Sequence, residues 1–160
     1  MPKKKVQAGA YFRYSAKANP ELPAKLDGLR KKYRLPGQLL QLEITESAYT
    51  QKPRQLIEMV GRLRAQGFRV EMDDFGSGYS SLNTLHEMPV DVVKLDLRFL
   101  SGSENSKGQE IIQAVVQMMQ RLHLPVIAEG VETAEQAALL AAAGCPVIQG
   151  FYYCRPISAD

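Results

Sequence analysis

The sequence has no tryptophan and only two cysteines and two histidines among its 160 residues. Cys145 and Cys154 do not have the spacing of metal ligands, so we expect reduced, structural thiols. His86 and His123 are expected on helix surfaces, without a partner at metal-ligand spacing. Cysteine and histidine therefore give no indication of a metal site.

Long hydrophobic runs and a strong charge of either sign are also lacking. No run of about 18 apolar residues is present, and the N-terminus lacks the apolar middle of a signal peptide. The net charge of +3 comes in part from Lys3, Lys4 and Lys5, which we interpret as a solvated tail and not as a surface for a nucleic-acid polymer. With 45% hydrophobic and 23% charged residues, the sequence predicts one soluble, cytoplasmic domain without a membrane segment.

Short β-branched runs alternate with longer helical patterns from about residue 21 onward. This alternation predicts an α/β fold, either a barrel or an open parallel sheet. The predicted helices cover residues 20–33, 53–67, 80–86, a long stretch around 111–122, and 133–144. The predicted strands cover residues 39–44, 68–72, 90–95, 125–128 and 146–148.

Polar residues follow or close each of the five predicted strands. Because the carboxyl ends of parallel strands lie on one face of a sheet, we expect these side chains to converge there. Asp73 and Asp74 are adjacent, and neighbouring carboxylates favour a divalent cation, although a solvated acidic turn is the alternative. The full set is Glu43, Glu46, Asp73, Asp74, Lys94, Asp96, Glu129, Glu132 and Gln149.

Five segments together resemble the EAL family of bacterial cyclic-di-GMP phosphodiesterases, in the family's order and spacing over residues 35–158. They are LEITES (42–47), MDDFGSGYSSL (72–82), VVKLD (92–96), IAEGVET (127–133) and QGFYYCRP (149–156). The resemblance implies a (β/α)8 TIM-like barrel, here incomplete, with about five to six parallel strands. It also implies signalling through hydrolysis of cyclic di-GMP to the linear dinucleotide by two Mg²⁺ or Mn²⁺ ions.

The same resemblance implies roles for single residues. Glu43, Asp73 and Asp74 match metal ligands, Glu129 matches a metal ligand or general base, and Lys94 matches the group that orients the attacking water. Gln149 and Arg155 match positions near the substrate, and Glu46 and Glu132 match glutamates that support the Gly-Ser-Gly loop. That loop, residues 75–81, resembles one used for dimer contacts and for control of metal binding, and it includes Phe75, Gly76, Ser77 and Gly78.

Simpler interpretations remain for several of these residues. Lys94 has the alternative role of a buried counter-ion for Asp73 or Asp96. The charge of Glu132 also complements the dipole of the helix that follows it. Tyr152 and Tyr153 are candidates for stacking on guanine and equally for packing in the core.

The sequence departs from the family at its start. A complete barrel needs about 250 residues, and no segment matches the family's opening Glu-Ala-Leu strand, which supplies a metal ligand, or its nearby arginine. A second ligand, an asparagine, is expected near residues 10–13, where the sequence is Ala10-Tyr11-Phe12-Arg13. We therefore divide the chain into a basic, altered or poorly ordered start, residues 1–19, without a β-like run, and a partial EAL-like domain, residues 20–160.

Three functional consequences follow from this departure. We expect little or no phosphodiesterase activity from this chain alone, and incomplete occupancy of its metal site, because two metal ligands are missing and the remaining carboxylates repel one another. The alternatives are a module that binds cyclic di-GMP without hydrolysis and a module that contacts a protein partner. We also expect homo-oligomers, formed through exposed strand edges or through the loop at residues 75–81.

Overall fold

Six parallel strands form one sheet, in which each strand pairs with the next along the chain. The computed structural model describes residues 10–14, 21–76, 82–97 and 106–156. This arrangement confirms the predicted α/β class, and the strand order is that of consecutive β/α units. The strands are β1 (Ala10–Tyr14), β2 (Leu40–Thr45), β3 (Arg69–Phe75), β4 (Val92–Asp96), β5 (Val126–Glu129) and β6 (Val147–Ile148).

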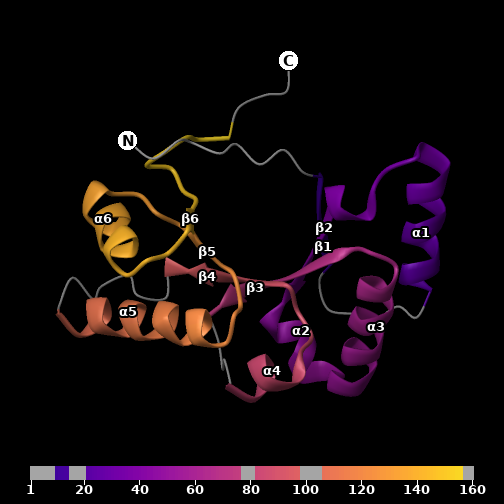
Figure 1. Cartoon of the computed structure of the whole chain (residues 1–160), viewed down its shortest axis with the longest axis horizontal. Coiled ribbons are helices and arrows are strands. Elements are labelled where there is room, and N and C mark those ends of the chain that lie inside the picture. The colour runs from indigo at the N-terminus through magenta and orange to yellow at the C-terminus, as the bar shows by residue number, and fades with distance from the viewer. Residues whose placement is uncertain (1–9, 15–20, 77–81, 98–105, 157–160) are drawn as a thin grey trace.

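Helices connect successive strands and cover one side of the sheet. In Figure 1, α3, α4 and α5 lie below the strands, with α1 and α6 at opposite ends of the molecule. None of the helices in the described ranges is long and apolar enough to cross a membrane. The helices are α1 (Leu22–Tyr33), the 3₁₀ helix η1 (Gly37–Leu39), α2 (Glu46–Gln51), α3 (Pro53–Ala65), α4 (Leu82–Glu87), α5 (Ser106–Arg121) and α6 (Ala134–Ala142).

The ends of α3 and α6 have the residues and the backbone geometry that the sequence predicts for them. Pro53 lies in the first turn of α3, and Gly67, just past its end, has a φ of 85°, which glycine adopts without a steric penalty. Helix α6 begins with a capping box, in which Thr133 accepts a hydrogen bond from the backbone of Gln136 and the Gln136 side chain accepts one from the backbone of Thr133. These local interactions set where each β/α unit turns toward the sheet.

The two faces of the sheet differ sharply in polarity. Because side chains alternate along a strand, one face carries apolar residues that pack on α3 and α5. Each buried valine, leucine, isoleucine or methionine among them contributes about 1.5–3 kcal/mol. This face consists of Leu42, Ile44, Val70, Met72, Val93, Leu95, Val126 and Ala128. The opposite face carries buried polar residues: Gln41, Glu43, Glu71, Asp73, Lys94 and Asp96.

Three local predictions were wrong or incomplete. Residues 1–15 were predicted to lack a strand, but β1 pairs in parallel with β2, with Arg13 in register with Glu43. Strand pairing therefore overrides a weak local pattern in this segment. Helix α2 was not predicted, and β3 extends three residues beyond the predicted end at Met72, so both aspartates lie within the strand.

Candidate active site at the carboxyl ends of the strands

Three carboxylates from three strands converge on the ammonium group of Lys94. The Lys94 Nζ atom lies 2.5 Å from Glu43 Oε1, 3.0 Å from Glu129 Oε1 and 3.4 Å from Asp73 Oδ1. The parallel register of β2 to β5 brings these strand ends to one edge of the sheet, as predicted for Glu43, Asp73, Lys94 and Glu129. The contact with Asp73 agrees with the alternative role of Lys94 as a counter-ion.

This cluster is buried, so its charges interact more strongly than they would in water. Asp73 is completely buried, and Lys94 and Glu43 expose only 6% and 7% of their surfaces. Burial alone lowers the pKa of Lys94, but the hydrogen bond to Glu43 and the charges of Glu129 and Asp73 outweigh it and raise that pKa. Lys94 is therefore a permanent ammonium ion at ordinary pH.

Glu129 is the most accessible carboxylate of the cluster, with 20% of its side chain exposed. Burial raises its pKa above the ordinary value, and the opposing effect of Lys94 does not cancel this rise. A carboxylate whose pKa lies closer to neutral accepts a proton more readily than an ordinary one. This property suits the general-base role that was predicted for Glu129.

The backbone is irregular at the Asp73-Asp74 pair. The register of β3 against β4 shifts between Met72 and Phe75, and Asp74 has a left-handed φ of 57°. The N–H of Asp74 donates to Asp73 Oδ1 over 3.0 Å. A bulge of this kind re-aims the side chains that follow it, so the two adjacent aspartates do not simply alternate between the two faces.

The other predicted site residues occupy varied positions. Glu46 is buried at the start of α2, whereas Glu132 and Gln149 are exposed. Arg155 lies over the ring of Phe151, with 5.5 Å between its guanidinium carbon and the ring centre. In the predicted loop, Phe75 is part of the core and Gly76 has a φ of 97°, while Ser77 and Gly78 lie outside the described residues.

Two buried polar residues next to the cluster were missed by the sequence analysis. Glu71 is completely buried two residues before Asp73, and Gln41 is 3% exposed two residues before Glu43. Their positions contained a usable signal, because residues two apart on a strand share a face. The predicted site residues follow or close their strands, whereas Gln41 and Glu71 lie in the strand interiors.

Comparison with known proteins identifies the family. The family model for the EAL domain matches residues 12–156. The chain belongs to the EAL domain family. The cyclic di-GMP phosphodiesterase NbdA of Pseudomonas aeruginosa is 44% identical over 119 residues, which cover 74% of this chain and 15% of NbdA. The cyclic di-GMP phosphodiesterase RocR of the same organism is 36% identical over 137 residues, covering 85% of this chain and 35% of RocR.

Solved EAL domains share the fold. The structure titled PaMucR phosphodiesterase, a cyclic-di-GMP complex, superposes with a TM-score of 0.85 at 32% identity and covers 94% of this chain and 62% of that chain. The FimX EAL domain from Pseudomonas aeruginosa, bound to cyclic di-GMP, gives a TM-score of 0.86 at 25% identity, with coverages of 92% and 62%. This chain therefore spans less than two thirds of the relatives it matches and corresponds to part of a TIM-barrel-like domain.

The carboxylates of the EAL chain suit a hard cation in their chemistry, because Mg²⁺ and Mn²⁺ prefer oxygen ligands. Oxygen atoms of Glu43, Asp73 and Glu129 already surround one positive charge, that of Lys94 Nζ. Across the described parts of the chain, no group of three or more His, Cys, Asp or Glu side chains is arranged to hold a metal ion. The oxygen donors therefore suit a metal ion in their chemistry. In their present arrangement, however, they form an ion cluster centred on Lys94.

Proposed function

We propose that this chain carries a metal-dependent phosphodiesterase site that acts on cyclic di-GMP and releases the linear dinucleotide. The observation that supports this proposal best is the convergence of Glu43, Asp73 and Glu129 from three neighbouring strands. NbdA and RocR are both named cyclic di-GMP phosphodiesterases. The same substrate and reaction are therefore the first to test for this chain.

Each residue of the cluster has a chemical task in this proposal. Glu43, Asp73 and Asp74 would hold Mg²⁺ or Mn²⁺, which when bound polarises the phosphodiester and makes hydroxide available near neutral pH. Glu129, with its raised pKa, accepts the proton of the attacking water. Lys94 carries the positive charge that offsets the negative charge growing on the phosphoryl oxygens.

We further propose that this chain by itself hydrolyses cyclic di-GMP slowly or not at all. Its sequence contains no match to the family's Glu-Ala-Leu ligand and has no asparagine at residues 10–13. Lys94 moreover competes for the three carboxylates that remain, because its contacts with them are 3.4 Å or shorter. Too few oxygen donors are then left to organise two metal ions.

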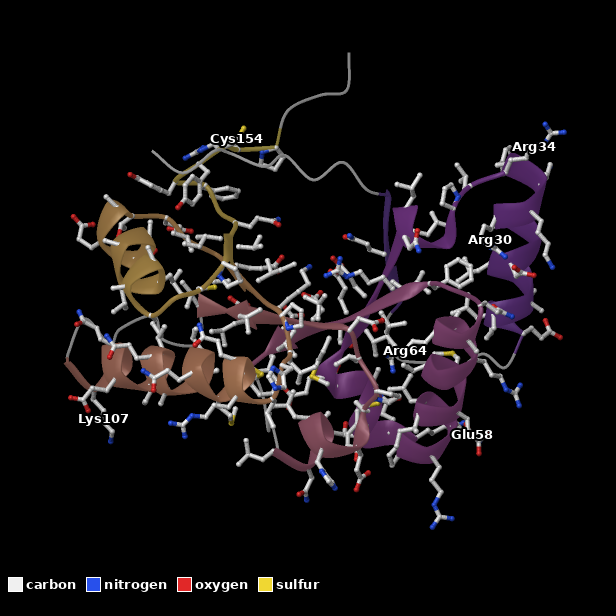
Figure 2. The ribbon with its side chains drawn as sticks, viewed as in Figure 1. Arg30, Arg34, Glu58, Arg64, Lys107 and Cys154 are labelled. Atoms are coloured by element: carbon white, nitrogen blue, oxygen red, sulfur yellow. The ribbon has the colours of Figure 1, made fainter. Side chains whose placement is uncertain are left out.

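Chromatographic detection of the linear dinucleotide tests these proposals. The purified chain is incubated with cyclic di-GMP and either Mn²⁺ or Mg²⁺, beside the variants Glu43→Gln and Asp73→Asn. Glu58→Gln is the matched control, because Glu58 is exposed and points away from the sheet on α3 (Figure 2). We expect at most slow turnover that both site variants abolish and the control retains. Rapid turnover would refute the proposed impairment, and turnover unaffected by Asp73→Asn would refute the assigned site.

Binding without hydrolysis is the second candidate function. It is favoured by the central position of Lys94, which neutralises part of the carboxylate charge without any metal. Titration calorimetry with cyclic di-GMP, first with Mn²⁺ and then with a chelator, separates the candidates. Binding that persists in the chelator, without product, supports a sensor. Binding that requires Mn²⁺ supports the phosphodiesterase site.

We also propose that the chain associates with itself or with a protein partner through the ends of its sheet. Strands β1 and β6 each pair with one other described strand, and exposed Val147, Phe151 and Tyr152 lie in or just beyond β6. Strand edges and exposed apolar side chains favour association. Light scattering coupled to size exclusion measures this directly, and a monodisperse monomer at high concentration would contradict self-association.

A further inference from the structure

A polar cavity lies at the amino ends of β2, β3 and β4, at the edge of the sheet opposite to the Lys94 cluster. Its volume is about 350 Å³, which is at the small end of the range for ligand sites. Arg69 and Asp73 are four residues apart on β3, so the cavity and the cluster are separated by about 13 Å along that strand. The cavity is lined by Gln38, Arg64, Gly67, Phe68, Arg69 and Asp91.

Two glycines bring the walls of this cavity together. A Cβ at Gly37 would lie 2.6 Å from the carbonyl oxygen of Gly67, so η1 packs directly on the turn between α3 and β3. This packing holds Gln38, the next residue of η1, beside that turn. A Cβ at Gly67 would meet no atom within 4 Å, so the space beside this residue is open.

Asp91 holds one of the two guanidinium groups in place. Arg64, in the last turn of α3, donates from Nε to Asp91 Oδ1 over 3.0 Å, and its Nη2 lies 2.9 Å from the same oxygen (Figure 2). The other oxygen of Asp91 accepts from the backbone N–H of Val70 over 2.9 Å. Both carboxylate oxygens are therefore occupied, while Nη1 of Arg64 has no acceptor among the described residues. A guanidinium fixed along one edge presents its other N–H groups to a ligand at little entropic cost.

The second guanidinium group, that of Arg69, has no comparable partner. Its Nε atom lies 3.9 Å from Glu71 Oε1, too far for a hydrogen bond, and the described ranges contain no other acceptor for it. The Arg69 side chain is 39% exposed, whereas Glu71 is completely buried. The lining thus carries two positive charges and one negative charge, and the negative charge already contacts Arg64.

We propose that this cavity binds a small phosphomonoester, whose phosphate group contacts Arg64 and Arg69. A phosphate group carries about 1.5 to 2 negative charges near pH 7 and has three acceptor oxygens. Guanidinium groups match such oxygens with paired, charge-assisted hydrogen bonds. Gln38 adds an amide for a hydroxyl group of the ligand, and the volume leaves room for a few carbon atoms beyond the phosphate. The binding requires neither a metal ion nor the Lys94 cluster, so it adds an effector site to the proposed function.

Titration calorimetry with ribose 5-phosphate, in a chelator and at constant ionic strength, tests this site. We expect saturable binding of one molecule per chain, no binding of ribose, and weaker binding of inorganic phosphate. Charge-assisted hydrogen bonds contribute enough that Arg69→Gln should weaken the binding by about tenfold. Arg54→Gln is the matched control, because Arg54 is exposed in the first turn of α3, at the other end of the helix from Arg64. It should change the affinity by less than about twofold.

Three outcomes would overturn the inference. They are the absence of saturable binding, an affinity that Arg69→Gln leaves unchanged, and an equal loss in Arg54→Gln, which indicates only a diffuse attraction to positive charge. Inorganic phosphate that binds as tightly as ribose 5-phosphate would overturn the assignment to an ester. Hydrolysis of cyclic di-GMP enters none of these measurements, so failure of the proposed function leaves the test intact.

A second measurement needs no variant, in case Arg69→Gln does not fold. The backbone amide resonances of Gly67, Phe68 and Val70 should shift when ribose 5-phosphate is added to the ¹⁵N-labelled unmodified chain, because these residues line or adjoin the cavity. Ribose should leave the same resonances in place. Shifts confined to other parts of the chain would overturn the inference.

Discussion

Replacement of Lys94 by methionine should destabilise the protein strongly, and in a pH-dependent way. The change keeps most of the apolar stem and removes only the ammonium. That ammonium contacts three carboxylate oxygens at 2.5, 3.0 and 3.4 Å, and the residue is 6% exposed. Removal of one partner from a buried ion pair costs about 3–5 kcal/mol, because it leaves uncompensated charge in the interior. A domain of ordinary stability, about 5–15 kcal/mol, loses a large part of its margin.

The pH dependence of this loss follows from the direction of each pKa shift. The folded pKa of Lys94 is raised above 10.5, so its stabilising contribution is complete below that value and disappears only at higher pH. The folded pKa of Glu129 is raised above 4.5, so stability from this group is greatest in acid and falls as pH rises through the raised value. Without Lys94 the carboxylates lose their counter-ion and bind protons more readily in the folded state. The variant should therefore recover stability as pH falls from 8 to about 5.

Urea unfolding followed by circular dichroism, at several pH values between 5 and 8, measures both effects. Lys107→Met is the matched control, because Lys107 is exposed near the start of α5 (Figure 2). We expect the control to change the free energy of unfolding by less than about 0.5 kcal/mol. A loss below about 1 kcal/mol for Lys94→Met, or a loss that is the same at pH 5 and pH 8, would refute the reasoning from the buried cluster.

Three further variants test how the fold holds the site in place. Gly150→Ala should lower the free energy of unfolding by about 3 kcal/mol, because a Cβ at this position would lie 2.0 Å from the carbonyl oxygen of Val131. Thermal unfolding measures this loss, and a loss of less than about 1 kcal/mol would contradict the close approach. Thr133→Ala removes half of the capping box of α6 and should cost about 1 kcal/mol, whereas Thr133→Ser should be nearly neutral. Asp91 accepts hydrogen bonds from the backbone N–H of Val70 at 2.9 Å and from Arg64 Nε at 3.0 Å. Asp91→Ala removes both and should lower the free energy of unfolding by about 1–3 kcal/mol, whereas the control Asp91→Asn should lower it less.

The site could be predicted in part because strand ends have a simple geometric rule. Glu43, Asp73, Lys94 and Glu129 each close or follow an alternating apolar run, and parallel strands bring such positions to one edge. The alternation of a strand puts Glu71 on the same face as Asp73, two residues later, but a single sequence does not tell whether that face is buried or solvated. Strand β1 was missed because its pairing partner lies 30 residues away, as in the pair Ala10 and Leu40.

The sequence by itself determined the α/β class, the order of its units and the family, because periodicity, helix caps and motif order are properties of short segments. The adjacent Asp73 and Asp74 at a strand end likewise indicate an oxygen-rich site from the sequence alone. Only the tertiary structure decided that three of those carboxylates share Lys94, and that Glu71 lies one layer below it without a described hydrogen bond. These facts depend on strand register and burial, which arise when segments far apart in the chain pack together.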